Sequence, residues 1–219
     1  MWCIAAITTE YRERMYKILD LYNEPYNRGF PVICFDEKSK QLLEDSRKPI
    51  PLKPGSIAKY DYEYKRNGTC NIFVAVEPKA GKHFIKVTEQ RTCADFALFI
   101  QWLVDKKYKR AKRIRIVLDN LNTHFEKSLY ETFSKQESRR ILKRIRFIYT
   151  PKHASWLNMA EIEINMMQKE CLSRNIGNRN DLIRELESWE NQNNMDKRKI
   201  YWRFTHEKAD KKLSKYYVS

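Results

Sequence analysis

The chain has 219 residues, enough for one domain with a buried core, and carries 43 lysine and arginine residues against 28 aspartate and glutamate residues. The net charge of +15 favours a polyanionic partner, because cations bind phosphates and release the counterions around nucleic acid. No run approaches the about 20 apolar residues that a membrane span needs. We therefore expect a nucleic-acid partner and no membrane, while a merely solvated basic surface is the alternative.

The five cysteines are spread along the chain, and no two of them stand at the spacing of a zinc site. They are Cys3, Cys34, Cys70, Cys93 and Cys171. An odd, scattered set predicts reduced thiols in a cytoplasmic protein rather than a disulfide framework. The apolar N-terminus is too short for the core of a secretory signal and has no basic lead.

The first part of the chain predicts one helix and then three strands. Residues 8–22 carry apolar side chains at the period of a helix, with Thr9 as the expected N-cap. Strands are expected at three short apolar runs, 31–36, 71–76 and 83–87. The proline-rich stretch 44–58 predicts a loop, and Asn67-Gly68 predicts a hairpin turn because both residues tolerate positive φ. These strands are expected to pair antiparallel.

The second part of the chain alternates helices and strands. Thr92 opens a helix whose buried face is marked by large apolar residues, namely Phe96, Phe99, Ile100 and Leu103. Strands 114–118 and 144–149 begin with arginines and finish apolar, as strands entering a covered sheet do. Further helices are expected near 124–136, 158–171 and 181–193, with a basic helix or loop at 138–144. This order predicts an α/β fold in which helices flank a mixed sheet.

Three acids stand where such a sheet presents its strand ends. Asp36 and Asp119 each end an apolar run, and Glu161 lies in the first turn of a predicted helix. Magnesium prefers carboxylate oxygens, and two such ions can hold the attacking and leaving oxygens of a phosphoryl transfer. The pattern therefore indicates a divalent-metal site, although Asp119 also fits a turn residue, since Asp-Asn is common where strands end.

The other two acids have rivals beside them. Glu37 follows Asp36, and the alternation of a strand lets only one of the pair face the site. Glu161 fits a capping box with Asn158, in which the acid binds the amide of the cap. Glu163 flanks the apolar stripe of the same helix about as closely as Glu161 does. Periodicity does not choose between these alternatives.

Basic residues supply the expected contacts to DNA. They concentrate in three stretches, 106–115, 139–146 and 197–203, any one of which alone also fits a solvated surface. His124 and His153 lie close in sequence to the acids, where they either orient phosphate or a ligand or serve as structural histidines. The candidate nucleic-acid-binding residues are His124, Lys152, His153, Arg113, Arg115, Lys143, Arg144 and Arg203.

Several segments resemble the catalytic part of bacterial insertion-sequence transposases related to mariner, the "six-thirty" insertion-sequence group. The resembling segments are CFDEK at 34–38, YDYEYKRNG at 60–68, LDNLNTH at 118–124, YTPKHASWLNMAEIE at 149–163 and WRFT at 202–205. The blocks around Asp119 and Glu161 are long and specific. Together the segments cover most of residues 11–217 in the order of the family.

The resemblance implies a ribonuclease-H-like fold with a mixed five-stranded sheet and an Asp-Asp-Glu (DDE) metal triad. Carried over by motif, the catalytic and metal-binding residues are Asp36, Asp119 and Glu161, the last because it follows Leu-Asn-Met-Ala. Members of the group use Mg²⁺ or Mn²⁺ to cut DNA at transposon ends and then join the freed 3′-hydroxyl to target DNA. The expected domains are an N-terminal helix and linker (1–30), the catalytic domain (31–195) and a basic C-terminal tail (196–219).

One departure from the family pattern bears on the partners. Full-length members carry a helix-turn-helix region before the catalytic part, and residues 1–30 are too few for such a module. We expect the chain to work with a helix-turn-helix partner polypeptide or through self-association, as the second product of a split reading frame or a truncated copy. The alternatives are a cleavage-only, structure-selective nuclease and a non-catalytic DNA-binding remnant that inhibits an intact transposase.

Overall fold

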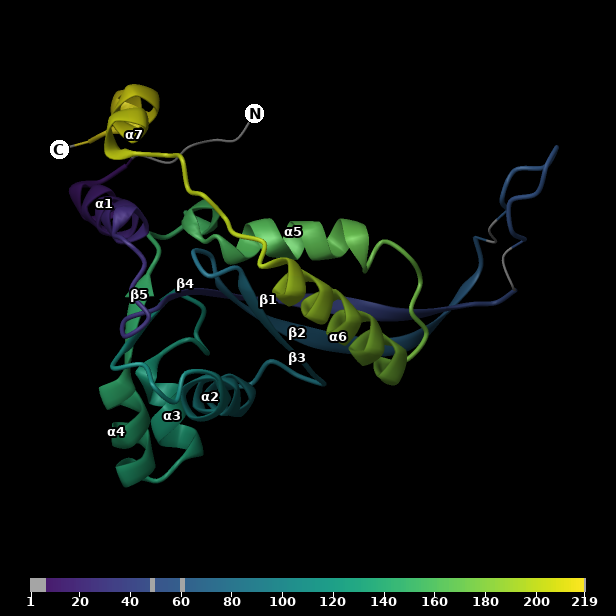
Figure 1. Ribbon diagram of the computed structural model, residues 1–219, viewed down its shortest axis with the longest axis horizontal. Helices are drawn as coiled ribbons and strands as arrows, with labels where there is room; N and C mark the ends of the chain where they lie inside the picture. The colour runs from purple at the N-terminus through teal and green to yellow at the C-terminus, as the bar shows by residue number, and fades with distance from the viewer. Residues whose placement is uncertain (1–6, 48–49, 60–61, 219) are drawn as a thin grey trace.

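The computed structural model describes residues 7–47, 50–59 and 62–218, so Cys3 and the start of the motif at 60–68 lie outside the described residues. The described residues form a mixed five-stranded sheet in the order β3-β2-β1-β4-β5, which confirms the predicted α/β class (Figure 1). The strands are β1 (Val32–Asp45), β2 (Tyr64–Glu77), β3 (Lys82–Thr88), β4 (Ile114–Leu118) and β5 (Ile145–Tyr149). The first three pair antiparallel as predicted, whereas β4 runs parallel to both β1 and β5.

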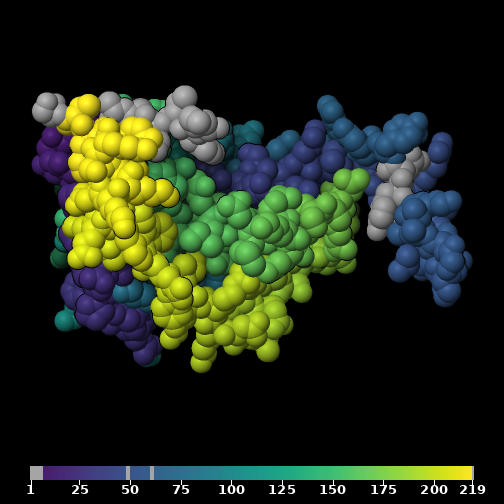
Figure 2. Space-filling view, turned by 90° about the horizontal axis from the view of Figure 1, so that it is seen from above, coloured from purple at the N-terminus to yellow at the C-terminus, as the bar shows by residue number. Residues whose placement is uncertain are grey.

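The strands β1 and β2 continue beyond the body of the molecule as a two-stranded ribbon (Figures 1 and 2). The hairpin turn predicted at Asn67-Gly68 is wrong, because both residues lie inside β2 and oppose the single residue Leu42 of β1. Gly68 has a φ of +95°, which a β-bulge requires as much as a turn does. The predicted strand 31–36 is also too short, because the ribbon part of β1 is polar and leaves no apolar run.

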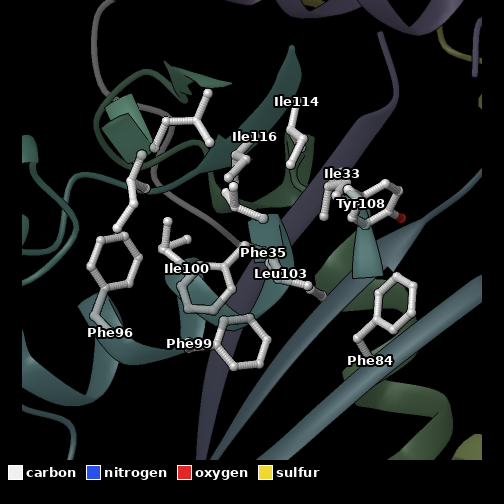
Figure 3. Close-up of a cluster of buried hydrophobic side chains, with 14 of the residues drawn as sticks. Ile33, Phe35, Phe84, Phe96, Phe99, Ile100, Leu103, Tyr108, Ile114 and Ile116 are labelled. Atoms are coloured by element: carbon white, nitrogen blue, oxygen red, sulfur yellow. The ribbon is translucent and has the colours of Figure 1, made fainter. Parts of the chain in front are cut away.

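One face of the sheet carries an aromatic core (Figure 3). It is covered by three helices: α2 (Cys93–Trp102), α3 (Glu126–Thr132) and α4 (Lys135–Arg144). The ring of Phe35 on β1 lies 5.4 Å from that of Phe96 and 5.3 Å from that of Phe99, both on α2. Thr92 and Asp95 form a capping box, which confirms the predicted start of α2. The predicted buried face is also confirmed, because Phe96, Phe99 and Ile100 are buried.

The opposite face is covered by α5 (Ala160–Glu170) and α6 (Arg179–Asp196) (Figure 1). Side chains of α6 also bind the outer edge of β3, where the main chain has no further strand to pair with. Asn194 accepts from the His83 amide at 2.7 Å and donates to its carbonyl at 2.9 Å, while Glu190 accepts from the Ile85 amide at 3.1 Å. The helix thereby protects a sheet edge that would otherwise pair with another chain.

The C-terminal segment returns to the N-terminal helix (Figure 2). The helices α1 (Thr9–Asn23) and α7 (His206–Leu213) share one apolar cluster, and the rings of Tyr16 and His206 stack 4.2 Å apart. The apolar stripe predicted for α1 is buried, but its N-cap is Thr8 rather than Thr9, because the Thr8 side chain accepts the Tyr11 amide.

Two expectations drawn from composition bear on the described residues. Their cysteines, Cys34, Cys70, Cys93 and Cys171, are free thiols, as predicted. Within the same part of the chain, none of the helices combines the length and the apolar character that crossing a bilayer requires.

Candidate metal centre

Asp36 lies within β1, and Asp119 directly follows the neighbouring parallel strand β4. Cys34 of β1 lies opposite Val117 of β4, and the two acids stand two residues further along each strand. Because side chains alternate with a period of two, the acids follow Cys34 and Val117 onto the face that packs against the start of α5. The parallel register thus directs two carboxylates to one face of the sheet, next to the C-terminal end of β4.

Asn158 ties the start of α5 to the part of β1 next to Asp36. Its side-chain nitrogen donates to the carbonyl of Phe35 at 2.8 Å and lies 3.5 Å from Asp36 Oδ2, while its Oδ1 accepts the Ala160 amide at 3.2 Å. Glu161, the second residue of α5, therefore lies close to the part of β1 that bears Asp36. The backbone amide of Asn158 donates to Ser155 instead, at 2.7 Å, so the reciprocal capping box with Glu161 is not formed.

The negative charges of Asp119 and Glu161 act on Asp36. Burial, together with these charges, raises the pKa of Asp36 to about 7, although the amide of Glu37 lowers it. Unscreened negative charge of this kind is relieved by a cation, and carboxylate oxygens suit Mg²⁺ or Mn²⁺. The donor set therefore fits a divalent ion.

The three acids do not form a preformed cage. Among the described residues, no three histidine, cysteine or acidic side chains stand close enough together to surround an ion. Magnesium commonly keeps several waters and takes one or two carboxylates together with substrate phosphates, so its binding does not require a complete set of protein ligands.

Both rival acids are already engaged elsewhere. Glu37 points to the other face of β1, where its Oε2 lies 2.8 Å from His124 Nε2. Glu163 is 2% exposed and contacts His83 at 2.9 Å and Arg198 at 3.0 Å. These ion pairs favour Asp36 and Glu161 over their neighbours as metal ligands.

His124 lies in the interior and holds one oxygen of Asp119. Its Nδ1 is 2.6 Å from Asp119 Oδ1, which also accepts the Leu121 amide at 3.1 Å. Burial disfavours the charged form of Asp119, yet the hydrogen bond and charge of His124 hold its pKa below the usual value. Burial alone would lower the pKa of His124, but Asp119 and Glu37 raise it to about 9. Of its predicted roles, orienting a ligand fits this burial, because contact with DNA requires exposure.

The other candidate nucleic-acid-binding residues fall into two groups. Arg113, Arg115, Lys143 and Arg144 stand at the beginnings of β4 and β5, whereas Asp119 follows the end of β4. Within this group, Arg115 binds Glu24 and the carbonyl of Phe30, and Arg144 donates to main-chain carbonyls between 108 and 111.

The second group lies in or beside the loop between β5 and α5, the helix that bears Glu161. Lys152 and His153 are exposed in the loop between β5 and α5, and His153 has a φ of +61°, which is uncommon for a residue other than glycine. Arg203 is exposed next to Phe204, whose ring contacts Trp156 of the same loop at 5.4 Å. The structure thus gathers Lys152, His153 and Arg203 around the segment that leads into α5.

Sequence reasoning missed the function of Glu37 as the partner of His124. Alternation along the strand already places Glu37 on the face opposite to Asp36. Nothing in the sequence, however, indicates that a histidine from a distant loop meets it there.

Comparison with known proteins assigns the chain to a protein family. Residues 31–183 match the family described as DDE superfamily endonuclease. Among proteins with curated functions, none matches the chain in sequence. Among solved structures, the chain is similar to the Mos1 mariner paired end complex with Mn, at a TM-score of 0.58 and 16% identity over 96% of this chain and 63% of that chain.

Two further structures of the same transposition system are similar. The mariner Mos1 paired end complex with Mg has a TM-score of 0.59 and 16% identity over 100% of this chain and 66% of that chain. The Mos1 Strand Transfer Complex has a TM-score of 0.57 and 13% identity over 87% and 57%. These likenesses show the fold, which is ribonuclease-H-like as predicted, and this chain spans less than two thirds of the length of the first structure.

Proposed function

This chain belongs to the DDE superfamily endonucleases, and from that premise we propose that it is the catalytic part of a transposase. In this proposal it cuts DNA at transposon ends and joins the freed 3′-hydroxyl to target DNA. The observation that carries the proposal is that the parallel register of β1 and β4 directs Asp36 and Asp119 to the same face of the sheet, with the start of the helix that bears Glu161 tied to β1 through Asn158.

Asp36, Asp119 and Glu161 would hold Mg²⁺ or Mn²⁺, which activates a water or 3′-hydroxyl and stabilises charge on the phosphate. The chain itself supplies orientation. Asp119 Oδ1 is engaged by His124 and the Leu121 amide, so its Oδ2 stays available as a ligand. The amide of Glu37 engages Asp36 Oδ1 at 2.8 Å in the same way.

The exposed cations Lys152, His153 and Arg203 are proposed to bind DNA phosphates beside the acids. Their support is their common position around the loop that leads into α5. Contacts of this kind fix the register of a duplex on the protein without reading its sequence.

We further propose that selection of the transposon end depends on a helix-turn-helix polypeptide or on self-association. The support for self-association is the outer end of the β1–β2 ribbon, where Leu52, Ile57 and Tyr62 are 73%, 76% and 87% exposed. Clustered exposed apolar side chains are typical of protein contacts. Sedimentation velocity of the chain and of a Leu52→Ser/Ile57→Ser variant tests this, since the proposal predicts that only the variant stays monomeric.

The experiment for the whole proposal is cleavage of a duplex carrying the inverted repeats that flank the coding region. It is run with Mg²⁺, with and without a helix-turn-helix partner. We expect Asp119→Asn to abolish cleavage and leave DNA binding nearly intact, because it removes a metal ligand and no phosphate contact. Unchanged cleavage by Asp119→Asn would refute the assignment. A precut end separates the alternatives, because a cleavage-only nuclease gives no strand-transfer product.

A further inference from the structure

Glu37 contacts Asp36 directly and contacts Asp119 through His124. Its amide donates to Asp36 Oδ1 at 2.8 Å. Its side-chain Oε2 lies 2.8 Å from His124 Nε2, and the opposite ring nitrogen of His124 lies 2.6 Å from Asp119 Oδ1. A single residue thus links two carboxylates that belong to different strands.

We propose that Glu37 is a positioning residue of the metal site, whose side chain orients Asp119 through His124; its main-chain amide, which Glu37→Leu and Glu37→Gln retain, holds Asp36. The inference rests on the proposed function, because it assigns Glu37 a purpose in holding a divalent cation. In this arrangement His124 and the Leu121 amide hold Asp119 Oδ1, while the Glu37 amide holds Asp36 Oδ1 and Asn158 lies 3.5 Å from Asp36 Oδ2. Loss of a partner that orients a metal ligand in this way typically lowers metal affinity by about 10- to 100-fold.

The histidine is held so firmly that it can transmit this orientation. Its side chain is 1% exposed, and its ring meets Phe35 edge-on at 5.2 Å and Phe96 at 5.0 Å. Both phenylalanines belong to the core beneath the sheet (Figure 3). The hydroxyl of Tyr149 also donates to the His124 carbonyl at 2.9 Å. This packing limits the imidazole to small movements, and the contact with Glu37 fixes its remaining orientation towards Asp119.

Fold stability alone does not account for Glu37. Its side chain is 5% exposed, yet within the described residues neither carboxylate oxygen has a well-aligned hydrogen bond. The contact with His124 is an ion pair at short distance, and Arg91 approaches the other oxygen only to 3.7 Å. A buried carboxylate so poorly satisfied is unfavourable for folding, and an apolar residue of similar volume would often serve the core as well.

The test is Mn²⁺ binding by the full chain without DNA, followed by the electron paramagnetic resonance of the free ion. Glu37→Leu removes the oxygen that faces His124, and Glu37→Gln keeps the shape and one oxygen. The matched control is Glu163→Gln, which breaks the other buried glutamate–histidine pair, Glu163–His83, and leaves the contact between Glu37 and His124 intact. Thermal unfolding of each variant establishes that it is folded at the temperature of the titration.

We expect Glu37→Leu to raise the Mn²⁺ dissociation constant about tenfold or more, and Glu37→Gln to raise it by a smaller factor of about three or more. Glu163→Gln should lose stability and bind Mn²⁺ like the wild type. Wild-type Mn²⁺ affinity in both Glu37 variants would overturn the inference, and if Glu37→Leu does not fold, wild-type affinity in Glu37→Gln alone overturns it. Asp119→Asn keeps the two proposals apart, because wild-type affinity there would refute the metal site itself.

Discussion

The side chain of Asn158 donates a hydrogen bond of 2.8 Å to the main-chain carbonyl of Phe35. This contact joins the segment before α5 to Phe35, the buried residue of β1 that precedes Asp36. It brings together two parts of the chain that are far apart in the sequence, and it determines where Glu161 lies relative to Asp36.

We predict that Asn158→Ala lowers cleavage at least about tenfold, because α5 no longer holds Glu161 at the site. It should also lower the free energy of unfolding by about 1–3 kcal/mol, since the Phe35 carbonyl loses its partner. The control is Asn193→Ala, since Asn193 is a buried asparagine that donates to the Trp189 carbonyl at 2.8 Å far from the acids. Equal loss of activity in the two variants would mean that only stability matters.

We predict that the metal-free protein loses stability as Asp36 ionises. In the fold its pKa is raised to about 7 from an ordinary value of 3.8, so between these values the folded chain binds more protons than the unfolded chain. The free energy of unfolding therefore falls as the pH rises from about 4 to about 7. Asp36→Asn should remove this fall and raise the free energy of unfolding at pH 8 by at least about 1 kcal/mol, measured by urea unfolding with a chelator. Parallel pH profiles of variant and wild type would contradict this.

Glu163 should show the opposite dependence. Burial works against its charge, but His83 and Arg198 hold its pKa below the model-peptide value of 4.5. The stability that the charge of Glu163 contributes is then fully present above that value, and it is lost as the pH falls through the lower pKa that Glu163 has in the folded chain. We expect Glu163→Gln to lower the free energy of unfolding by about 3 kcal/mol at pH 7 and by less near pH 4. A difference between variant and wild type that grows on acidification would show that Glu163 does not act through its charge.

Substitutions of Arg144 and Lys152 should change different properties: the first should lower stability, and the second should weaken DNA binding. Arg144 donates to the carbonyls of Tyr108 at 2.8 Å and Ala111 at 2.9 Å, so Arg144→Ala should destabilise the fold by about 1–3 kcal/mol. Lys152 is exposed, so Lys152→Ala should leave stability unchanged, weaken DNA binding and lower the slope of log affinity against log salt by about one. The measurements are urea unfolding and fluorescence anisotropy at several salt concentrations. A salt slope that changes in Arg144→Ala but not in Lys152→Ala would reverse these roles.

The elements with strong local signals were predictable from the sequence. The helix after Thr92 has a capping box and an apolar stripe, and the strands at 114–118 and 145–149 are short apolar runs bounded by charge. These signals are local, because the cap and the period depend on neighbours within a few residues. The ribbon of β1 and β2 was missed because its polar residues pair with each other in solvent, where no burial pattern marks the strand.

The acids themselves were also identified from the sequence, and the family resemblance chose Asp36 and Glu161 from their neighbours. Only the tertiary structure decides what the remaining charged residues do. It buries His124 between Asp119 and Glu37, pairs Glu163 with His83, and commits Arg144 to main-chain carbonyls. Charge and periodicity are properties of single residues and short windows, whereas the partner of a buried charge is set by which distant elements pack against it.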